Sequence, residues 1–237
     1  MSLRRRFPLV LCLLPAPVLA GPAEVVTTYA DIALATYGDS LSTAQALRRA
    51  VGDLVADPSP QTLAAARQAW TAARVPYQQS EVFRFGNPIV DDWEGRVNAW
   101  PLDEGLIDYV AEGTPSTEDN ELAQLNVIAN PVLELGSETL DAATITPDTI
   151  RALHEAGGIE ANVASGYHAI EFLLWGQDLN GTGPGAGSRP HTDFLAGAGC
   201  TNGNCDRRAQ YLVAATDLLV SDLREMTGNW ETDGPAR

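Results

Sequence analysis

The chain has 237 residues, of which 31 are acidic and 15 are basic, so its formal net charge is −16 near neutral pH. A surface this acidic repels nucleic acids and anionic membranes and attracts cations. The sequence contains no lysine, which excludes a lysine nucleophile or a Schiff base. The length suits one domain of ordinary size with a sizeable core.

Residues 1–20 have the features of a secretory signal peptide. Three arginines precede a short apolar run, and the segment ends in the small residue Ala20, after which we expect cleavage. Its removal would change the net charge from −16 to −19, because it carries three arginines and no acid. No later run approaches the length of a membrane span. We therefore expect an exported mature chain at residues 21–237 without a transmembrane segment.

Helical periodicity dominates the first part of the mature chain. Apolar residues recur every three or four positions over residues 24–56, which predicts a long amphipathic helix. Ser59 is a typical N-cap for a second helix with Pro60 at its first position, and Pro76 should kink or end that helix. Over residues 83–109 glycines and prolines interrupt the pattern, so we expect irregular loops and short helical turns.

The second half of the chain carries weaker periodic segments. We expect helices near residues 121–129 and 147–156. A buried helix should run from about residue 160 to Trp175 and end at Gly176, because glycine is common just after a helix. These segments are shorter than the first helix and are expected to pack against it.

The region before the last helix is rich in glycine and contains the two cysteines of the mature chain. We expect a long loop over residues 180–204, with Cys200 and Cys205 closing a small loop by a disulfide, as is common in exported proteins. Asp206 would then cap a final helix with one apolar face. No strand-like alternation of useful length occurs, so the sequence predicts an all-α helical bundle.

The segment over residues 166–176 is the most informative part of the chain. It places His168 and Glu171 three residues apart, and side chains at this spacing lie on one face of a helix. The neighbours of Glu171 are almost all apolar, so we expect its carboxylate to be buried and to need a partner. His168, a metal ion, or an arginine such as Arg84 or Arg96 could be that partner.

The spacing of donors limits the kind of metal site. The usual zinc-peptidase and di-iron spacings do not occur in the chain. Two protein ligands are too few for a catalytic zinc, whereas iron accepts histidine together with carboxylates. Two acid-rich segments could supply further carboxylates, and they contain Glu81, Asp103 and Glu104. On spacing alone, a hydrogen-bonded pair with a purely structural role is an equal alternative.

Several segments resemble the imelysin family of bacterial envelope proteins. The matching stretches are residues 73–77, 81–85, 94–104, 107–109 and 166–178. The last contains the family's Gly-x-His-x-x-Glu signature, with its histidine at His168 and its glutamate at Glu171. The resemblance implies an all-helical fold of two bundle-like domains and carries these two residues over as metal ligands. We expect residues 21–237 to form one imelysin-like domain. Because this chain stops at Arg237, either the second domain is absent or the sequence is truncated.

The resemblance implies an exported metal-binding protein of the periplasm or outer envelope that is linked to iron acquisition. It also implies iron as the favoured metal and envelope iron-uptake components as partners. The alternative is an imelysin-type zinc metallopeptidase, in which Glu171 is a ligand or general base. That enzyme would need a third ligand, for which the candidates are His154, His191, Glu81 and Asp103. A further alternative is a helical envelope interaction module in which His168 and Glu171 form a structural pair. All three hypotheses are open at the level of the sequence.

Overall fold

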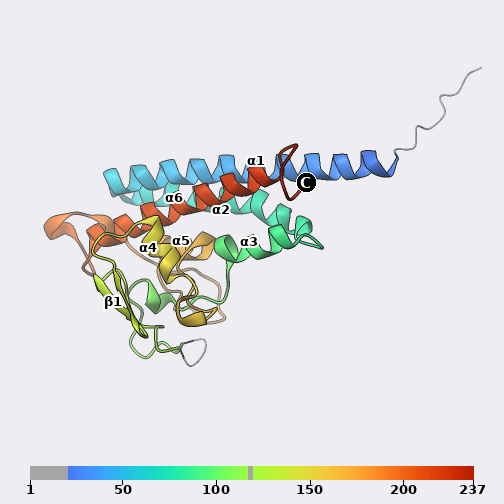
Figure 1. Ribbon diagram of the computed structural model, residues 1–237. Coiled ribbons are helices and arrows are strands. Elements are labelled where there is room, and N and C mark those ends of the chain that lie inside the picture. The colour runs from blue at the N-terminus through green and yellow to red at the C-terminus, as the bar shows by residue number, and fades with distance from the viewer. Residues whose placement is uncertain (1–20, 117–119) are drawn as a thin grey trace, which may run out of the picture.

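The computed structural model describes residues 21–116 and 120–237, so the expected signal peptide at residues 1–20 lies outside the described residues. Three long helices form the main layer: α1 (Pro22–Ala56), α2 (Pro60–Gln79) and α6 (Cys205–Asn229). α1 packs along both α2 and α6, and Figure 1 shows the three helices running side by side. The described part of the chain is predominantly helical, which confirms the predicted all-α helical bundle.

α1 forms as its periodicity predicts. It buries one stripe of small and apolar side chains, which includes Ala30, Ala33, Tyr37, Ala44, Leu47, Val51 and Leu54. Its first turns run past the ends of the neighbouring helices (Figure 1), and Val25, Val26 and Ile32 are exposed there. Among the described residues, no helix has both the length and the apolar character that a membrane crossing requires.

α2 begins as the sequence predicts but ends later. The Ser59 hydroxyl accepts a hydrogen bond from the N–H of Thr62, and Pro60 takes the first helical position. Pro76 lies inside α2, which continues to Gln79, so the expectation that Pro76 could end the helix is wrong. The ring of Tyr77 in this last turn is buried in the core, and this burial offsets the backbone hydrogen bond that proline cannot donate.

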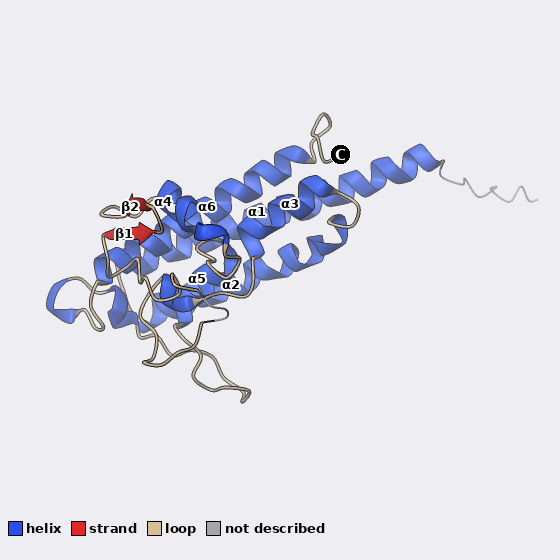
Figure 2. Ribbon diagram, turned by 60° about the horizontal axis from the view of Figure 1, so that its bottom comes forward, coloured by secondary structure: helices blue, strands red, loops and turns tan. Residues whose placement is uncertain are grey.

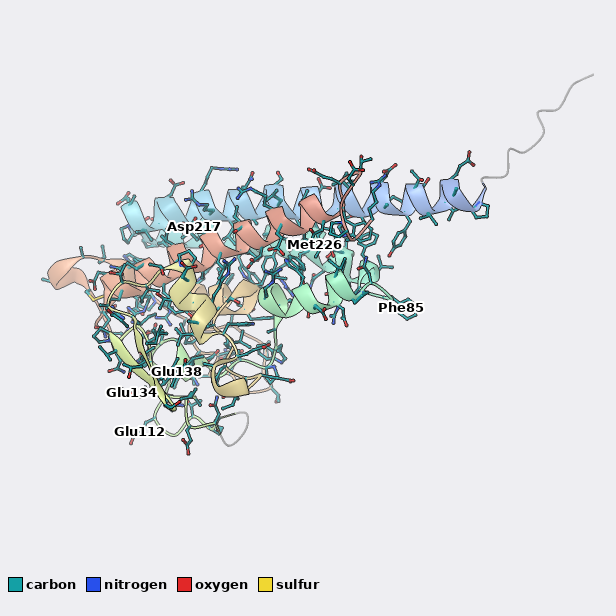
Figure 3. The ribbon with its side chains drawn as sticks, in the orientation of Figure 1. Phe85, Glu112, Glu134, Glu138, Asp217 and Met226 are labelled. Atoms are coloured by element: carbon teal, nitrogen blue, oxygen red, sulfur yellow. A yellow bond between two sulfur atoms is a disulfide. The ribbon has the colours of Figure 1, made fainter. Side chains whose placement is uncertain are left out.

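A second layer of shorter elements covers one side of the long helices. It contains α3 (Pro88–Asn98), α4 (Pro147–Leu153), α5 (Gly166–Trp175) and a hairpin of β1 (Val132–Leu135) and β2 (Glu138–Asp141). The antiparallel strands pair Leu133 with Leu140. In both views most of the loops lie on this side of the bundle (Figures 1 and 2). Figure 3 labels Glu134 of β1 and Glu138 of β2 on the hairpin.

The structure corrects further details of the sequence prediction. Residues 83–109 are not only loops and turns, because α3 buries Val90, Trp93 and Val97 at helical spacing despite the internal glycine at position 95. The hairpin is a short strand pair that the sequence did not predict. The helix expected from residue 160 begins at Gly166, and the one expected to reach residue 156 ends at Leu153.

A further correction is that residues 121–129 form turns instead of a helix. The N–H groups of Asn126, Val127 and Ile128 donate to the carbonyls of residues 105–107, at 2.9, 3.0 and 3.1 Å. A backbone N–H that bonds a distant segment cannot also close a helical turn. Tertiary pairing therefore overrides the local helical pattern here.

α5 is held close to α3 and α2 by its first residues. Gly166 has a φ of +80°, and a Cβ at this position would overlap the backbone carbonyl of Val97. The indole N–H of Trp70 donates to the carbonyl of Tyr167 at 2.9 Å. Gly176, with a φ of +71°, ends α5 as predicted. These contacts set the direction in which the exposed face of α5 points.

Short 3-10 turns and a loop complete the chain. The turns are η1 (Ser80–Phe83), η2 (Glu104–Leu106), η3 (Ala156–Gly158), η4 (His191–Phe194) and η5 (Gly197–Gly199). The sulfur atoms of Cys200 and Cys205, the first residue of α6, lie at bonding distance, 2.06 Å. The N-cap of α6 is Asn204, and Asp206, which was expected to cap it, lies in the first turn instead.

Candidate functional site

His168 and Glu171 lie on one face of α5, as their spacing predicts. The His168 Nδ1 and Glu171 Oε2 atoms are 3.2 Å apart. The side chain of His168 is 19% exposed and that of Glu171 is 43% exposed. The prediction that Glu171 is buried is therefore wrong. Ile170 and the leucines at 173 and 174 point into the core, and the opposite face of the same short helix is left open.

The exposed face of α5 forms a wall of a cavity of about 700 Å³. The cavity is lined by residues of the segment after α3, of α5, and of the glycine-rich loop: Trp100, Leu102, Glu104, His168, Glu171, Phe172, Trp175, Gly176, Asp178, Gly185, Ala186 and Gly187. Three of the lining residues carry carboxylates, and none of these described residues is an arginine. The cavity thus combines aromatic walls with an excess of negative charge, which favours a cation.

Glu104 contributes to the cavity a carboxyl group whose pKa is raised. Burial raises the pKa of Glu104, Arg189 lowers it, and the nearby carboxylates of Asp178 and Glu171 raise it, so that its net value is about 7. Near neutral pH the Glu104 carboxyl is therefore partly protonated. An incoming cation would favour its ionised form, so Glu104 could release a proton and add its negative charge to the cavity.

Trp100 lies over the imidazole at the edge of the cavity. The centroids of the Trp100 and His168 rings are 5.0 Å apart, and the planes are tilted by 55°. Trp100 is 70% exposed although it is a large aromatic residue. An indole that lies on a histidine at the mouth of a cavity is well placed to contact a bound molecule.

A buried network of ion pairs lies next to Phe172, whose ring lines the cavity. Arg189 Nη1 is 2.7 Å from Asp108 Oδ2 and 3.0 Å from Asp193 Oδ2, and Arg208 Nε is 2.6 Å from Asp108 Oδ2. The guanidinium of Arg189 lies 5.4 Å from the centroid of the Phe172 ring. All four charged side chains are buried, and the two arginines balance the two aspartates. The carboxylates that line the cavity have no such arginine partners in its lining.

The structure separates the other predicted acids from His168. Glu81 lies on η1, where its carboxylate pairs with Arg84 at 3.3 Å, outside the cavity. Asp103 is buried, and its Oδ2 accepts a hydrogen bond from Asn120 at 2.8 Å. Among the predicted carboxylates, only Glu104 lines the cavity with the pair on α5.

The other histidines lie outside the cavity. The Nε2 of His154 donates to the carbonyl of Gly95 at 3.1 Å, and burial lowers the pKa of this imidazole. His191 begins η4 and does not line the cavity. Within residues 21–116 and 120–237, no three or more histidine, cysteine, aspartate or glutamate side chains are grouped closely enough to hold a metal ion.

The two arginines proposed as partners of Glu171 pair elsewhere. Arg84 contacts Asp91 at 2.8 Å, and Arg96 contacts Glu225 at 2.7 Å. Glu171 therefore retains only His168 as a polar partner within the described residues. One imidazole and one adjacent carboxylate fit a metal ion that accepts mixed nitrogen and oxygen donors, with further positions filled by other groups.

Sequence reasoning missed Asp178 and residues 185–187, which were expected only to be part of a long loop. A Cβ on Gly187 would overlap the carbonyls of Trp175 and Gly176, so this loop must run against the end of α5. The N–H of Arg189 donates to the carbonyl of Trp175 at 2.8 Å and holds it there. The glycines at 185 and 187 were the available signal, because glycine permits close backbone approach.

The chain is similar to proteins of one family. The family model described as Imelysin matches residues 33–237. Iron-regulated protein A of Synechococcus elongatus is 31% identical over 91 residues, which are 38% of this chain and 26% of that protein. A crystal structure named for an iron-regulated protein A precursor from Parabacteroides distasonis has a TM-score of 0.53 and 25% identity. That match covers 87% of this chain and 44% of the other.

The matched part of each relative is thus less than half of that relative's length. The crystal structure shares the helical arrangement over most of the described residues, and the family match spans α2 to the C-terminus and most of α1. The chain therefore belongs to the imelysin family.

Proposed function

We propose that this chain is an exported metal-binding protein linked to iron acquisition, with His168 and Glu171 as metal ligands. One observation carries the proposal: the pair opens into a cavity with an excess of carboxylates instead of being paired inside the core. A purely structural pair would be expected to be buried and saturated with hydrogen bonds. This pair is half open and makes one mutual contact.

The donor set supports iron more than zinc. Zinc sites are usually completed by three or four protein ligands, whereas iron accepts histidine with carboxylates and retains open positions. Glu104 lines the same cavity and is the best placed additional carboxylate. Two relatives are named as iron-regulated, which supports the same metal.

Export is part of the proposal. Residues 1–20 would direct secretion, Cys200 and Cys205 would form a disulfide in an oxidising compartment, and the strongly acidic chain would attract cations. The partners would then be iron-uptake components of the envelope, to which the protein would pass its metal.

A zinc metallopeptidase is the second candidate, and one observation favours it. The pKa of Glu104 is raised to about 7, which suits a general base beside a metal ligand. Digestion of an unfolded protein substrate, with and without a chelator, tests this reading. Cleavage that a chelator abolishes and that Glu104→Gln lacks would support it, and the absence of cleavage would remove it.

Titration with Fe(II) under anaerobic conditions tests the main proposal. We expect wild-type protein to bind iron, and His168→Ala and Glu171→Gln to weaken binding by at least about tenfold, because each removes a ligand. His191→Ala is the matched control, since this histidine lies outside the cavity. Equal iron binding by wild type and His168→Ala would overturn the assignment.

A further inference from the structure

The size of the cavity does not match a bare metal ion. Its volume is about 700 Å³, whereas one water molecule occupies about 30 Å³ of liquid. Pockets of roughly 300–1,000 Å³ are typical of sites for small organic molecules. An ion held by His168 and Glu171 would leave most of this space filled with water.

The protein supplies few donors for a metal. His168 and Glu171 are adjacent, but the described residues contain no group of three or more metal-binding side chains. A zinc or iron ion bound by this pair would have at least half of its coordination positions filled by other donors. Those donors would be water or an organic chelator that arrives with the metal.

The walls of the cavity favour the organic chelator. The rings of Trp100, Phe172 and Trp175 all line it, together with Leu102. Trp100 is 70% exposed and lies on the His168 ring at 5.0 Å, so a flat apolar group bound beside the imidazole would cover this indole. Covering exposed aromatic surface is favourable, and water alone would not provide that gain.

The charge of the cavity limits the charge of its ligand. Glu104, Glu171 and Asp178 line the cavity, and none of its described lining residues is an arginine. A complex with a net negative charge would be repelled by these carboxylates in a partly dehydrated site. Aromatic faces also attract cations. A neutral or cationic complex therefore fits best.

From these observations we infer that the ligand is a metal chelate: a metal ion with an organic chelator, neutral or cationic overall. His168 and Glu171 complete the coordination of the metal, and the apolar part of the chelator lies against Trp100, Phe172 and Trp175. The inference rests on the proposed metal-binding function and names the form in which the metal is bound.

Calorimetric titrations with three forms of one metal test this inference. The probes are aqueous Zn(II), its one-to-one cationic complex with terpyridine, and its anionic complex with nitrilotriacetate. Zinc is used because it is redox-inert. We expect the terpyridine complex to bind at least about tenfold more tightly than aqueous zinc, terpyridine alone or the anionic complex.

Variants separate the aromatic wall from the metal ligands. Trp100→Ala should weaken binding of the terpyridine complex by about tenfold and leave that of aqueous zinc unchanged. His168→Ala should weaken binding of both. Phe85→Ala is the matched control, because Phe85 is 94% exposed, projects from the molecule beyond α3 (Figure 3), and does not line the cavity.

The outcomes of these titrations distinguish the chelate inference from the proposed metal-binding function. If aqueous zinc binds through His168 but the terpyridine complex binds no more tightly, the chelate inference is wrong and the metal-binding function stands. An unchanged affinity of Trp100→Ala for the complex would overturn the inference in the same way. Terpyridine that binds equally with and without metal would overturn it too. If neither form of zinc binds, and Fe(II) also fails to bind, both the inference and the proposed function are wrong.

Discussion

Two clusters of charge lie close to the Phe172 ring, and they differ in how their charges are balanced. In one, two aspartates and two arginines are buried and contact one another at 2.6–3.0 Å. In the other, three carboxylates line an open cavity without an arginine among the described lining residues. We expect the balanced cluster to support the fold and the unbalanced one to be available to the proposed ligand.

One carboxylate from each cluster shows the difference. Burial by itself would raise the pKa of Asp193, but hydrogen bonds from Tyr109, Thr201 and Asn202 bring that pKa below its ordinary value. Burial also raises the pKa of Glu104, to about 7, and nearby carboxylates add to the effect. Desolvation is common to both groups, so the presence of donors decides which of them is ionised.

Arg189 is the exception inside the balanced cluster. Its Nε and Nη2 atoms are buried, and no hydrogen-bond acceptor among the described residues reaches them. The guanidinium lies 4.9 Å from the Tyr109 ring centroid and 5.4 Å from that of Phe172. Attraction between the cation and these ring faces offsets part of the cost.

The largest expected effect comes from unbalancing the buried cluster. Asp108→Asn removes the negative charge that contacts both Arg189 and Arg208. We expect a loss of about 3–5 kcal/mol of unfolding free energy, because two buried guanidinium groups would share the one remaining carboxylate. Urea unfolding measures it, with Asp92→Asn on the exposed face of α3 as control. A loss below about 1 kcal/mol would show that the network does not support the fold.

Displacing the loop over residues 185–187 should lower the unfolding free energy less than Asp108→Asn does. A Cβ on Gly187 would overlap the carbonyls of Trp175 and Gly176. We expect Gly187→Ala to lower the unfolding free energy by about 1–3 kcal/mol and to weaken metal binding, since the loop is a wall of the site. Gly38→Ala in α1 is the control, because no atom lies within 4 Å of its added Cβ. Unchanged metal affinity in Gly187→Ala would show that this loop does not contribute to metal binding.

The pH dependence of stability tests the charge imbalance directly. Glu104 binds its proton more tightly in the folded chain, where its pKa is about 7, than in the unfolded chain, where the ordinary value of 4.5 applies. Its contribution to stability is therefore fully present below about pH 4.5 and is lost as the pH rises through about 7.

Glu104→Gln should remove this part of the pH dependence. Urea unfolding of both proteins at about pH 5 and about pH 8 measures it, and the wild type should lose more stability between the two than the variant. Metal affinity of the wild type should rise over the same interval, because the carboxylate must be ionised to bind a cation. The same loss of stability in both proteins would show that a group other than Glu104 causes this pH dependence.

The smallest expected change in stability comes from Glu171, the counterpart of Asp108 in the open cluster. Its side chain is 43% exposed, and its contact with His168 is a surface pair. Glu171→Gln should change the unfolding free energy by less than about 1 kcal/mol, although it removes a proposed metal ligand. A loss as large as that of Asp108→Asn would favour the structural-pair hypothesis and would break the comparison between the two clusters.

Local sequence determined the long helices, the helix stop at Gly176 and the shared face of His168 and Glu171. These features follow from periodicity, capping and spacing, which act over a few residues. The all-α class followed because the long helices account for much of the chain.

Tertiary structure alone decided which charges are balanced. Asp108 and Arg208 are 100 positions apart, and the spacing of the sequence does not show that they meet. It also decided that Glu171 is open, because packing against α2, α3 and α6 chose which face of a nearly all-apolar helix enters the core. Burial and partner geometry are properties of the assembled fold, so only the fold could join Glu104, Asp178 and the 185–187 loop to His168 in one cavity.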